Sequence, residues 1–140
     1  MARQRGQWSQ SKLDRYLSEG YGMGKGDLYK PWITVSNSTS KGLSTRTPGW
    51  KTNRVHHFLS KKEMLLFYIF EWSPFIRDIR EQFPLLKLDL AQKIADEMGI
   101  NYYRCSQTGT PYVLTTDFML SVEQEGKIVE VARTFKMSKE

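Results

Sequence analysis

The stretch YVLTTDFMLSVEQEGKIVEVARTF, residues 112–135, decides the fold, because it contains two strands and the turn between them. Apolar residues dominate both halves, and the polar segment EQEG (123–126) separates them, which is typical of a β-hairpin. We expect the hairpin to pair Val122 with Lys127 across this segment.

Asp117 is the unusual residue of this hairpin, since the expected pairing sets it opposite Ala132 and near Glu130 on the same face. A carboxylate within an apolar strand costs free energy unless it is paired or coordinates a cation, which favours a functional interpretation of Asp117. Two carboxylates on adjacent strands form an oxygen-rich pocket of the kind that holds Mg²⁺. For Glu130 alone, a solvent-exposed strand residue is the alternative.

Upstream of the hairpin, SKKEMLLFYIFEW (60–72) predicts a helix. Its middle, MLLFYIF, is apolar on every side, so we expect the helix to lie deep in the core. Ser60 and Glu63 have the spacing of a capping box, in which the glutamate turns back to the start of its own helix. On these residues alone, the capping interpretation of Glu63 is favoured over a functional one.

Two more elements lie between this helix and the hairpin. The segment SPFIRDIREQFPLL (73–86) predicts a strand that carries charged residues among apolar ones and stops at Pro84. A second helix is expected over 89–98, with Gly99 closing it.

The N-terminal third of the chain gives weaker signals. Ser11 is expected to begin a short helix that ends at Gly20. The glycines at alternate positions over 20–26 predict a flexible connector whose backbone can approach DNA closely. PWITVS (31–36) predicts a strand, and the polar segment 37–53 predicts a loop, either a DNA-contacting arm or a surface excursion.

Composition excludes several classes of protein. With 140 residues, 39% of them hydrophobic, the chain fits one globular domain. No run approaches the ~20 apolar residues of a membrane span, and the N-terminus lacks the apolar core of a signal peptide, so a cytoplasmic protein is expected. Cys105 has no second thiol, and the adjacent His56 and His57 are poorly placed as paired ligands. Any metal would therefore be a hard cation held by carboxylates.

Positive charge is concentrated in the first half of the chain. Residues 1–62 contain 12 Lys or Arg against 3 Asp or Glu, whereas residues 63–140 contain 9 against 12. Basic and aromatic residues alternate there, which suits phosphate contacts and base stacking on nucleic acid. The predicted DNA-binding residues are Arg3, Arg5, Arg15, Lys25, Lys30, Arg46, Lys51 and Arg54. The alternative is a solvated basic face with Trp32 and Trp50 in the core.

Four segments in this order carry a family resemblance: GKGDLYKPWITV (24–35), TNRVHHFLSKKE (52–63), FEWSPFIRDIREQFPLL (70–86) and TTDFML (115–120). Together they resemble TnsA, the endonuclease subunit of heteromeric bacterial cut-and-paste transposases, and the similarity spans roughly residues 18–136. The layout of a helix glutamate, a strand aspartate and, in the next strand, a glutamate two positions before the place where the pattern has lysine also resembles the PD-(D/E)xK restriction-endonuclease-like superfamily. The resemblance implies an α/β fold with a mixed sheet flanked by helices.

The resemblance also implies roles for individual residues. Glu63, Asp117 and Glu130 fall on the metal-binding acidic positions of the family, which makes a capping role the lesser interpretation of Glu63. One or two Mg²⁺ ions are implied, with Mn²⁺ as a substitute. The catalytic lysine of the family falls on position 132, where this chain has Ala132. We therefore expect a catalytically disabled chain, and an engineered substitution accounts for this better than a natural inactive homologue.

The implied activity is cleavage of the 5′ strand of double-stranded DNA at transposon ends. A DDE-type transposase, TnsB, would cut the other strand, and an AAA+ ATPase, TnsC, would regulate the reaction in the bacterial nucleoid. We expect one domain over 1–140, made of a basic helix (1–20), a DNA-contacting segment (20–55) and a nuclease core (56–136). The regulator-binding C-terminal domain of larger members is not expected. The alternative function is a noncatalytic DNA-binding or architectural subunit.

Overall fold

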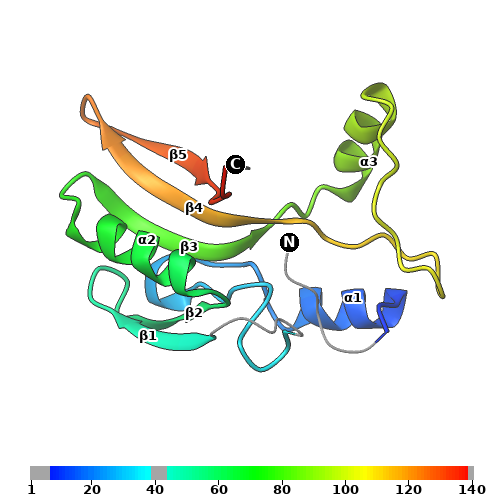
Figure 1. Cartoon of the computed structure of the whole chain (residues 1–140), viewed down its shortest axis with the longest axis horizontal. Helices are drawn as coiled ribbons and strands as arrows, with labels where there is room; N and C mark the ends of the chain where they lie inside the picture. The colour runs from blue at the N-terminus through cyan, green and yellow to red at the C-terminus, as the bar shows by residue number, and fades with distance from the viewer. Residues whose placement is uncertain (1–6, 39–43, 139–140) are drawn as a thin grey trace.

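Two antiparallel sheets and three α-helices make up the part of the chain that the computed structural model describes, residues 7–38 and 44–138 (Figure 1). In chain order the elements are α1 (Gln10–Ser18), the 3₁₀ helix η1 (Gly26–Leu28), β1 (Thr45–Gly49), β2 (Arg54–Phe58), α2 (Lys61–Trp72), β3 (Ile76–Pro84), α3 (Leu88–Glu97), β4 (Thr115–Gln124) and β5 (Lys127–Arg133). The sheets have the strand orders β1-β2 and β3-β4-β5. The α/β class is confirmed, although the described strands form two antiparallel sheets rather than one mixed sheet.

The β4–β5 hairpin turns on two residues. Glu125 and Gly126 have φ angles of 51° and 76°, which is the geometry of a type I′ turn. Gln124 therefore pairs with Lys127. The expected pairing of Val122 with Lys127 is wrong by two residues, because EQEG contributes only its last two residues to the turn.

This shift changes which residue lies opposite Asp117. Ala132 pairs with Met119. When the same register is continued along the chain, Thr134 comes opposite Asp117, and the Thr134 hydroxyl donates a hydrogen bond of 2.6 Å to Asp117 Oδ2. The prediction that Asp117 faces Ala132 is therefore wrong.

Helix α2 packs on the same side of the three-stranded sheet as the β1–β2 hairpin (Figure 1). The helix expected over 60–72 is confirmed, and its Phe67 is fully buried. However, Leu65, Ile69 and Trp72 are 49%, 65% and 77% exposed, so the prediction of burial on every side is wrong. The three-stranded sheet and the β1–β2 hairpin cover only one side of α2.

Strand β3 and helix α3 follow the sequence prediction closely. Strand β3 ends at Pro84, as expected, and α3 occupies nearly the range predicted for the second helix. Gly99 closes α3 with a φ of 69°, a left-handed conformation that favours glycine. In Figure 1, α3 stands beyond the end of the three-stranded sheet.

The N-terminal third departs most from expectation. Helix α1 is capped by Ser9, whose hydroxyl accepts a hydrogen bond from Lys12 N at 3.3 Å, rather than by Ser11. The expected strand at 31–36 is irregular, and the expected loop at 37–53 contains β1, which pairs with β2. Residues 39–43 of that loop lie outside the described residues.

The expected flexible connector at 20–26 is instead a series of turns that leads into η1. Gly24 has a φ of 85°, and a Cβ there would lie 2.8 Å from the carbonyl oxygen of Leu28. Both the conformation and the space at position 24 therefore require glycine, and this glycine belongs to a compact backbone path rather than to a flexible connector.

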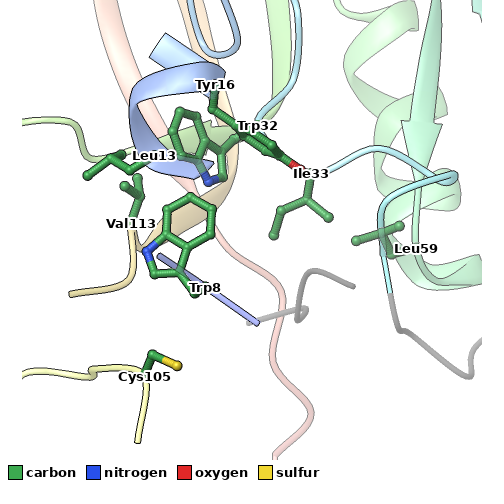
Figure 2. Packing of buried hydrophobic residues seen from close by; sticks show 8 residues of the cluster. All are labelled: Trp8, Leu13, Tyr16, Trp32, Ile33, Leu59, Cys105 and Val113. Atoms are coloured by element: carbon green, nitrogen blue, oxygen red, sulfur yellow. The ribbon is translucent and has the colours of Figure 1, made fainter. Parts of the chain in front are cut away.

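One aromatic cluster fixes the N-terminal segment to the rest of the chain (Figure 2). The rings of Trp8, Tyr16 and Trp32 contact one another at centroid distances of 5.2–6.1 Å. Trp8 Nε1 also donates to the carbonyl oxygen of Pro111 at 2.8 Å. Of the two tryptophans whose role was open, Trp32 lies in the core, while Trp50 is 62% exposed.

A buried ion pair connects the two sheets. Glu81 of β3 is 1% exposed and accepts hydrogen bonds from the guanidinium of Arg54, from His56 Nδ1 at 3.1 Å and from His57 N at 2.7 Å. Arg54 was predicted to contact DNA, but its side chain is only 8% exposed and is bound to Glu81. The guanidinium is therefore occupied inside the protein, and a DNA contact of Arg54 stays a prediction that this burial does not favour.

The described helices include none that is both long and apolar enough to cross a membrane.

Candidate active site

Glu63 lies in the first turn of α2, where the capping box forms. Ser60 Oγ accepts a hydrogen bond from Glu63 N at 3.2 Å. In return, Glu63 Oε2 accepts one from the N–H of Leu59 at 2.9 Å, one residue before the usual partner. The capping interpretation is therefore confirmed for Glu63, and the other carboxylate oxygen, Oε1, accepts a hydrogen bond from Gln82 Nε2 at 3.3 Å.

Asp117 lies near the start of β4 and holds the segment that follows β5. Its Oδ2 accepts hydrogen bonds from the hydroxyl of Thr134 and from Phe135 N, the latter at 2.9 Å. Residues 134–137 also contact the beginning of α2. Lys62 Nζ lies 5.4 Å from the centroid of the Phe135 ring and contacts the sulfur of Met137.

Glu63 and Asp117 are close enough to affect each other electrostatically. Burial raises the pKa of Glu63 above its ordinary value, the N–H of Leu59 opposes this rise, and the negative charge of Asp117 adds to it. The two carboxylates, one from α2 and one from β4, are thus within electrostatic range of each other. Within residues 7–38 and 44–138, no group of three or more His, Cys, Asp or Glu side chains is arranged to hold a metal ion.

Glu130 lies elsewhere on the sheet. It pairs with Ser121, whose hydroxyl donates to it at 2.9 Å, and it forms an ion pair with Arg80. Partial burial raises the pKa of Glu130, but the hydrogen bonds from Ser121 and Arg80 outweigh this and leave the pKa below its ordinary value. Four residues of strand, roughly 13 Å, separate Ser121 from Asp117. The prediction that Asp117 and Glu130 are near neighbours is therefore wrong.

Sequence reasoning set Lys136 aside, because four residues of strand, roughly 13 Å, separate it from position 132. Lys136 follows Thr134 by two positions, within the segment that Asp117 and Lys62 hold. Recognising Glu125-Gly126 as a two-residue turn would have pointed to it, because that turn shifts the pairing of the hairpin by two residues.

The predicted DNA-binding residues lie in different environments. Arg15, Lys25 and Arg46 are exposed, and Lys30 and Lys51 are partly buried, with their ammonium groups on backbone carbonyl oxygens. Lys25 Nζ also lies 3.9 Å from Glu130 Oε1. Arg3 and Arg5 lie outside the described residues.

Comparison with known proteins gives one close match. No family model matches the sequence. The chain is 42% identical over 120 residues to the Tn7 transposition protein TnsA of Escherichia coli. The alignment covers 86% of this chain and 43% of that protein, so the chain spans less than half the length of this relative. The two antiparallel sheets and three helices are compatible with a restriction-endonuclease-like core. Over these 120 residues, the chain is similar to TnsA.

Proposed function

We propose that this chain is the DNA endonuclease subunit of a heteromeric bacterial transposase and cleaves the 5′ strand at transposon ends. The observation that carries the proposal is the meeting of Glu63, Asp117 and residues 134–137, which come from three separate parts of the chain. The match to a transposition protein supports double-stranded DNA as the substrate. A DDE-type transposase such as TnsB and an ATPase such as TnsC are the proposed partners, in the bacterial cytoplasm.

Mg²⁺ is the proposed cofactor, with Mn²⁺ as a substitute. Proteins usually hold Mg²⁺ with one or two carboxylates and leave its other positions to waters and substrate phosphates. Glu63 and Asp117 supply two carboxylates whose mutual repulsion a cation would relieve, so the donor set fits this ion. When bound, the ion would supply Lewis-acid polarisation of the scissile phosphate.

Lys136 is the proposed catalytic lysine. In the PD-(D/E)xK pattern, the lysine stands two residues after the position that adjoins the aspartate in the neighbouring strand. The observed register gives that adjoining position to Thr134, which supports Lys136 rather than position 132. A lysine ammonium at this point would neutralise negative charge that develops on the phosphate. On this proposal, Ala132 does not disable the enzyme.

Metal removal tests the proposed function. With Mg²⁺ and the partner transposase, the chain is expected to nick the 5′ strand of labelled transposon-end DNA, and EDTA should abolish the product until excess Mg²⁺ is restored. Denaturing gels of each labelled strand give the readout, and a reaction without this chain is the control. Binding of the DNA with no 5′ nick under any metal condition would instead support the architectural role.

The basic half is expected to bind DNA through phosphates rather than through base edges. Arg46 is exposed in β1, so Arg46→Ala should weaken binding about equally for all sequences. The dependence of log K on log salt should also become shallower by about 1. Fluorescence anisotropy over a salt series checks this, with Lys93→Ala on α3 as a matched loss of exposed charge. Equal effects of the two changes would contradict a localised DNA-binding face.

A further inference from the structure

We infer that Gln82 is a positioning residue that orients Glu63 in the proposed metal site, an inference that rests on the proposed function. Gln82 is 3% exposed and has a φ of 44°, in the left-handed region that residues other than glycine seldom adopt. It belongs to β3, and its side chain is shielded from solvent. Its side chain is hydrogen-bonded to Glu63.

The β3–β4 register places Gln82 across from Asp117. Glu81 pairs with Phe118 and Phe83 pairs with Thr116, so the residues between them face each other. From this position the Gln82 amide reaches Glu63 on α2. Gln82 thus lies opposite one proposed metal ligand in the strand register, and its side chain is hydrogen-bonded to the other.

The orientation of the amide is fixed by its two partners. Gln82 Nε2 donates to Glu63 Oε1 at 3.3 Å, while Gln82 Oε1 accepts from the hydroxyl of Thr115 at 3.0 Å. An ionised carboxylate only accepts hydrogen bonds, so the amide must present its nitrogen to Glu63. Thr115 satisfies the amide oxygen in that orientation and so opposes a flip.

The backbone of Gln82 is held in its unusual conformation from the other side. Its carbonyl oxygen accepts hydrogen bonds from Trp32 N at 3.1 Å and from the hydroxyl of Tyr29 at 3.2 Å. A left-handed φ at a residue other than glycine costs of order 1–3 kcal/mol and persists only where the surroundings enforce it. Glycine would adopt this φ without strain, but it would leave Glu63 Oε1 without its donor.

These contacts explain why Gln82 is held in its strained conformation. Leu59 N holds one oxygen of Glu63 and Gln82 holds the other, which leaves the remaining lone pairs of the carboxylate in a defined direction. Hydrogen bonds from outside the ligand set orient metal-binding carboxylates, and losing one typically weakens metal affinity 10–100-fold. Gln82 is therefore expected to set the affinity of the site for its cation without touching the DNA.

The test measures Mn²⁺ binding to the metal-free chain in the absence of DNA, by electron paramagnetic resonance, together with melting curves. Gln82→Gly removes the amide but keeps the backbone carbonyl and tolerates the φ of 44°. It should raise the Mn²⁺ dissociation constant 10–100-fold. Thr115→Val, which removes the group that fixes the amide, should raise it by a smaller factor while the chain remains folded.

The outcomes separate this inference from the proposed function. If wild type binds Mn²⁺ and cleaves DNA while folded Gln82→Gly binds Mn²⁺ with unchanged affinity, Gln82 only supports the fold and the inference is overturned. If Gln82→Gly does not fold, Thr115→Val decides, and an unchanged dissociation constant there overturns the inference. If wild type itself binds no Mn²⁺, the proposed metal site and the role of Gln82 are both overturned.

Discussion

Replacing Lys136 by alanine is expected to lower the rate of 5′-strand cleavage by about 10²–10³-fold, the usual loss when one electrostatic stabiliser of a transition state is removed. The reason is the position of Lys136 relative to Asp117. Lys136 stands two residues after Thr134, and Thr134 donates a hydrogen bond to Asp117. Single-turnover cleavage of labelled transposon-end DNA, with Mg²⁺ and the partner transposase present, measures the effect.

The matched variant is Ala132→Lys. Ala132 pairs with Met119 in the hairpin, two residues along the strand from the pair that contains Asp117. A lysine at 132 is therefore expected to leave the cleavage rate within a few-fold of wild type. If wild type is inactive and Ala132→Lys restores cleavage, position 132 carries the missing lysine and the assignment of Lys136 is wrong. DNA binding, measured by anisotropy, should weaken slightly for Lys136→Ala and strengthen slightly for Ala132→Lys, since the two changes alter the charge by one unit in opposite directions.

The sequence predicts the order of the core elements well, because α2, β3 and α3 have strong local signals. Ser60 caps a long apolar run, Pro84 ends β3, and Gly99 ends α3. These features depend on neighbouring residues and on backbone preferences, which a single sequence displays. The burial of α2 could not be predicted in the same way, because it depends on how much of the helix the sheet covers.

The candidate site illustrates how a short-range error propagates. Glu63 and Asp117 were both predicted, and the fold places them within electrostatic range of each other. The third acidic residue and the lysine position were carried over from the family resemblance, and the assumed four-residue loop agreed with them because it set Glu130 near Asp117. Because side chains alternate along a strand, a shift of two residues keeps the same face but moves every partner by roughly 6–7 Å. The predicted pairing therefore placed Ala132 opposite Asp117, whereas the structure places Thr134 there.

Long-range packing accounts for the other differences. The segment at 31–36 has the composition of a strand, yet the ring of Trp32 packs against Trp8 and Tyr16. The backbone N–H of Trp32 donates a hydrogen bond to the carbonyl oxygen of Gln82. Likewise, the charge of Arg54 suggested a DNA contact, whereas its partner lies 27 residues away in β3. Neither partner is visible in the local pattern, so tertiary structure overrides the local preference in both cases.

The buried partner of Arg54 gives the largest expected effect on stability. Glu81→Gln keeps the shape of the side chain but removes its charge, which leaves the guanidinium buried without a counter-ion. Removing one member of a buried, hydrogen-bonded pair typically costs about 3–5 kcal/mol, so the free energy of unfolding should fall by about that amount. Urea denaturation followed by circular dichroism measures it.

Glu123→Gln is the matched control. Glu123 forms an ion pair with Arg77 in which both side chains are well exposed, and such pairs contribute only about 0–1 kcal/mol. If Glu81→Gln and Glu123→Gln lower the free energy of unfolding equally, the pair between the two sheets is not a main source of stability.

The pH dependence of unfolding gives a second check on Glu81. Burial alone would raise its pKa, but hydrogen bonds from His56 and Arg54 outweigh burial and lower the pKa to about 2. Because the folded pKa lies below the ordinary value of 4.5, the contribution of Glu81 is complete above about pH 4.5 and is lost as the pH falls toward 2. Wild type should therefore lose stability over this range, and Glu81→Gln should lose less, because it has no carboxylate to protonate. Parallel curves for the two proteins would show that Glu81 titrates normally in the folded chain. Gln82 follows Glu81 directly in β3. The buried pair of Glu81 and Arg54 therefore also stabilises the part of the strand from which Gln82 orients Glu63.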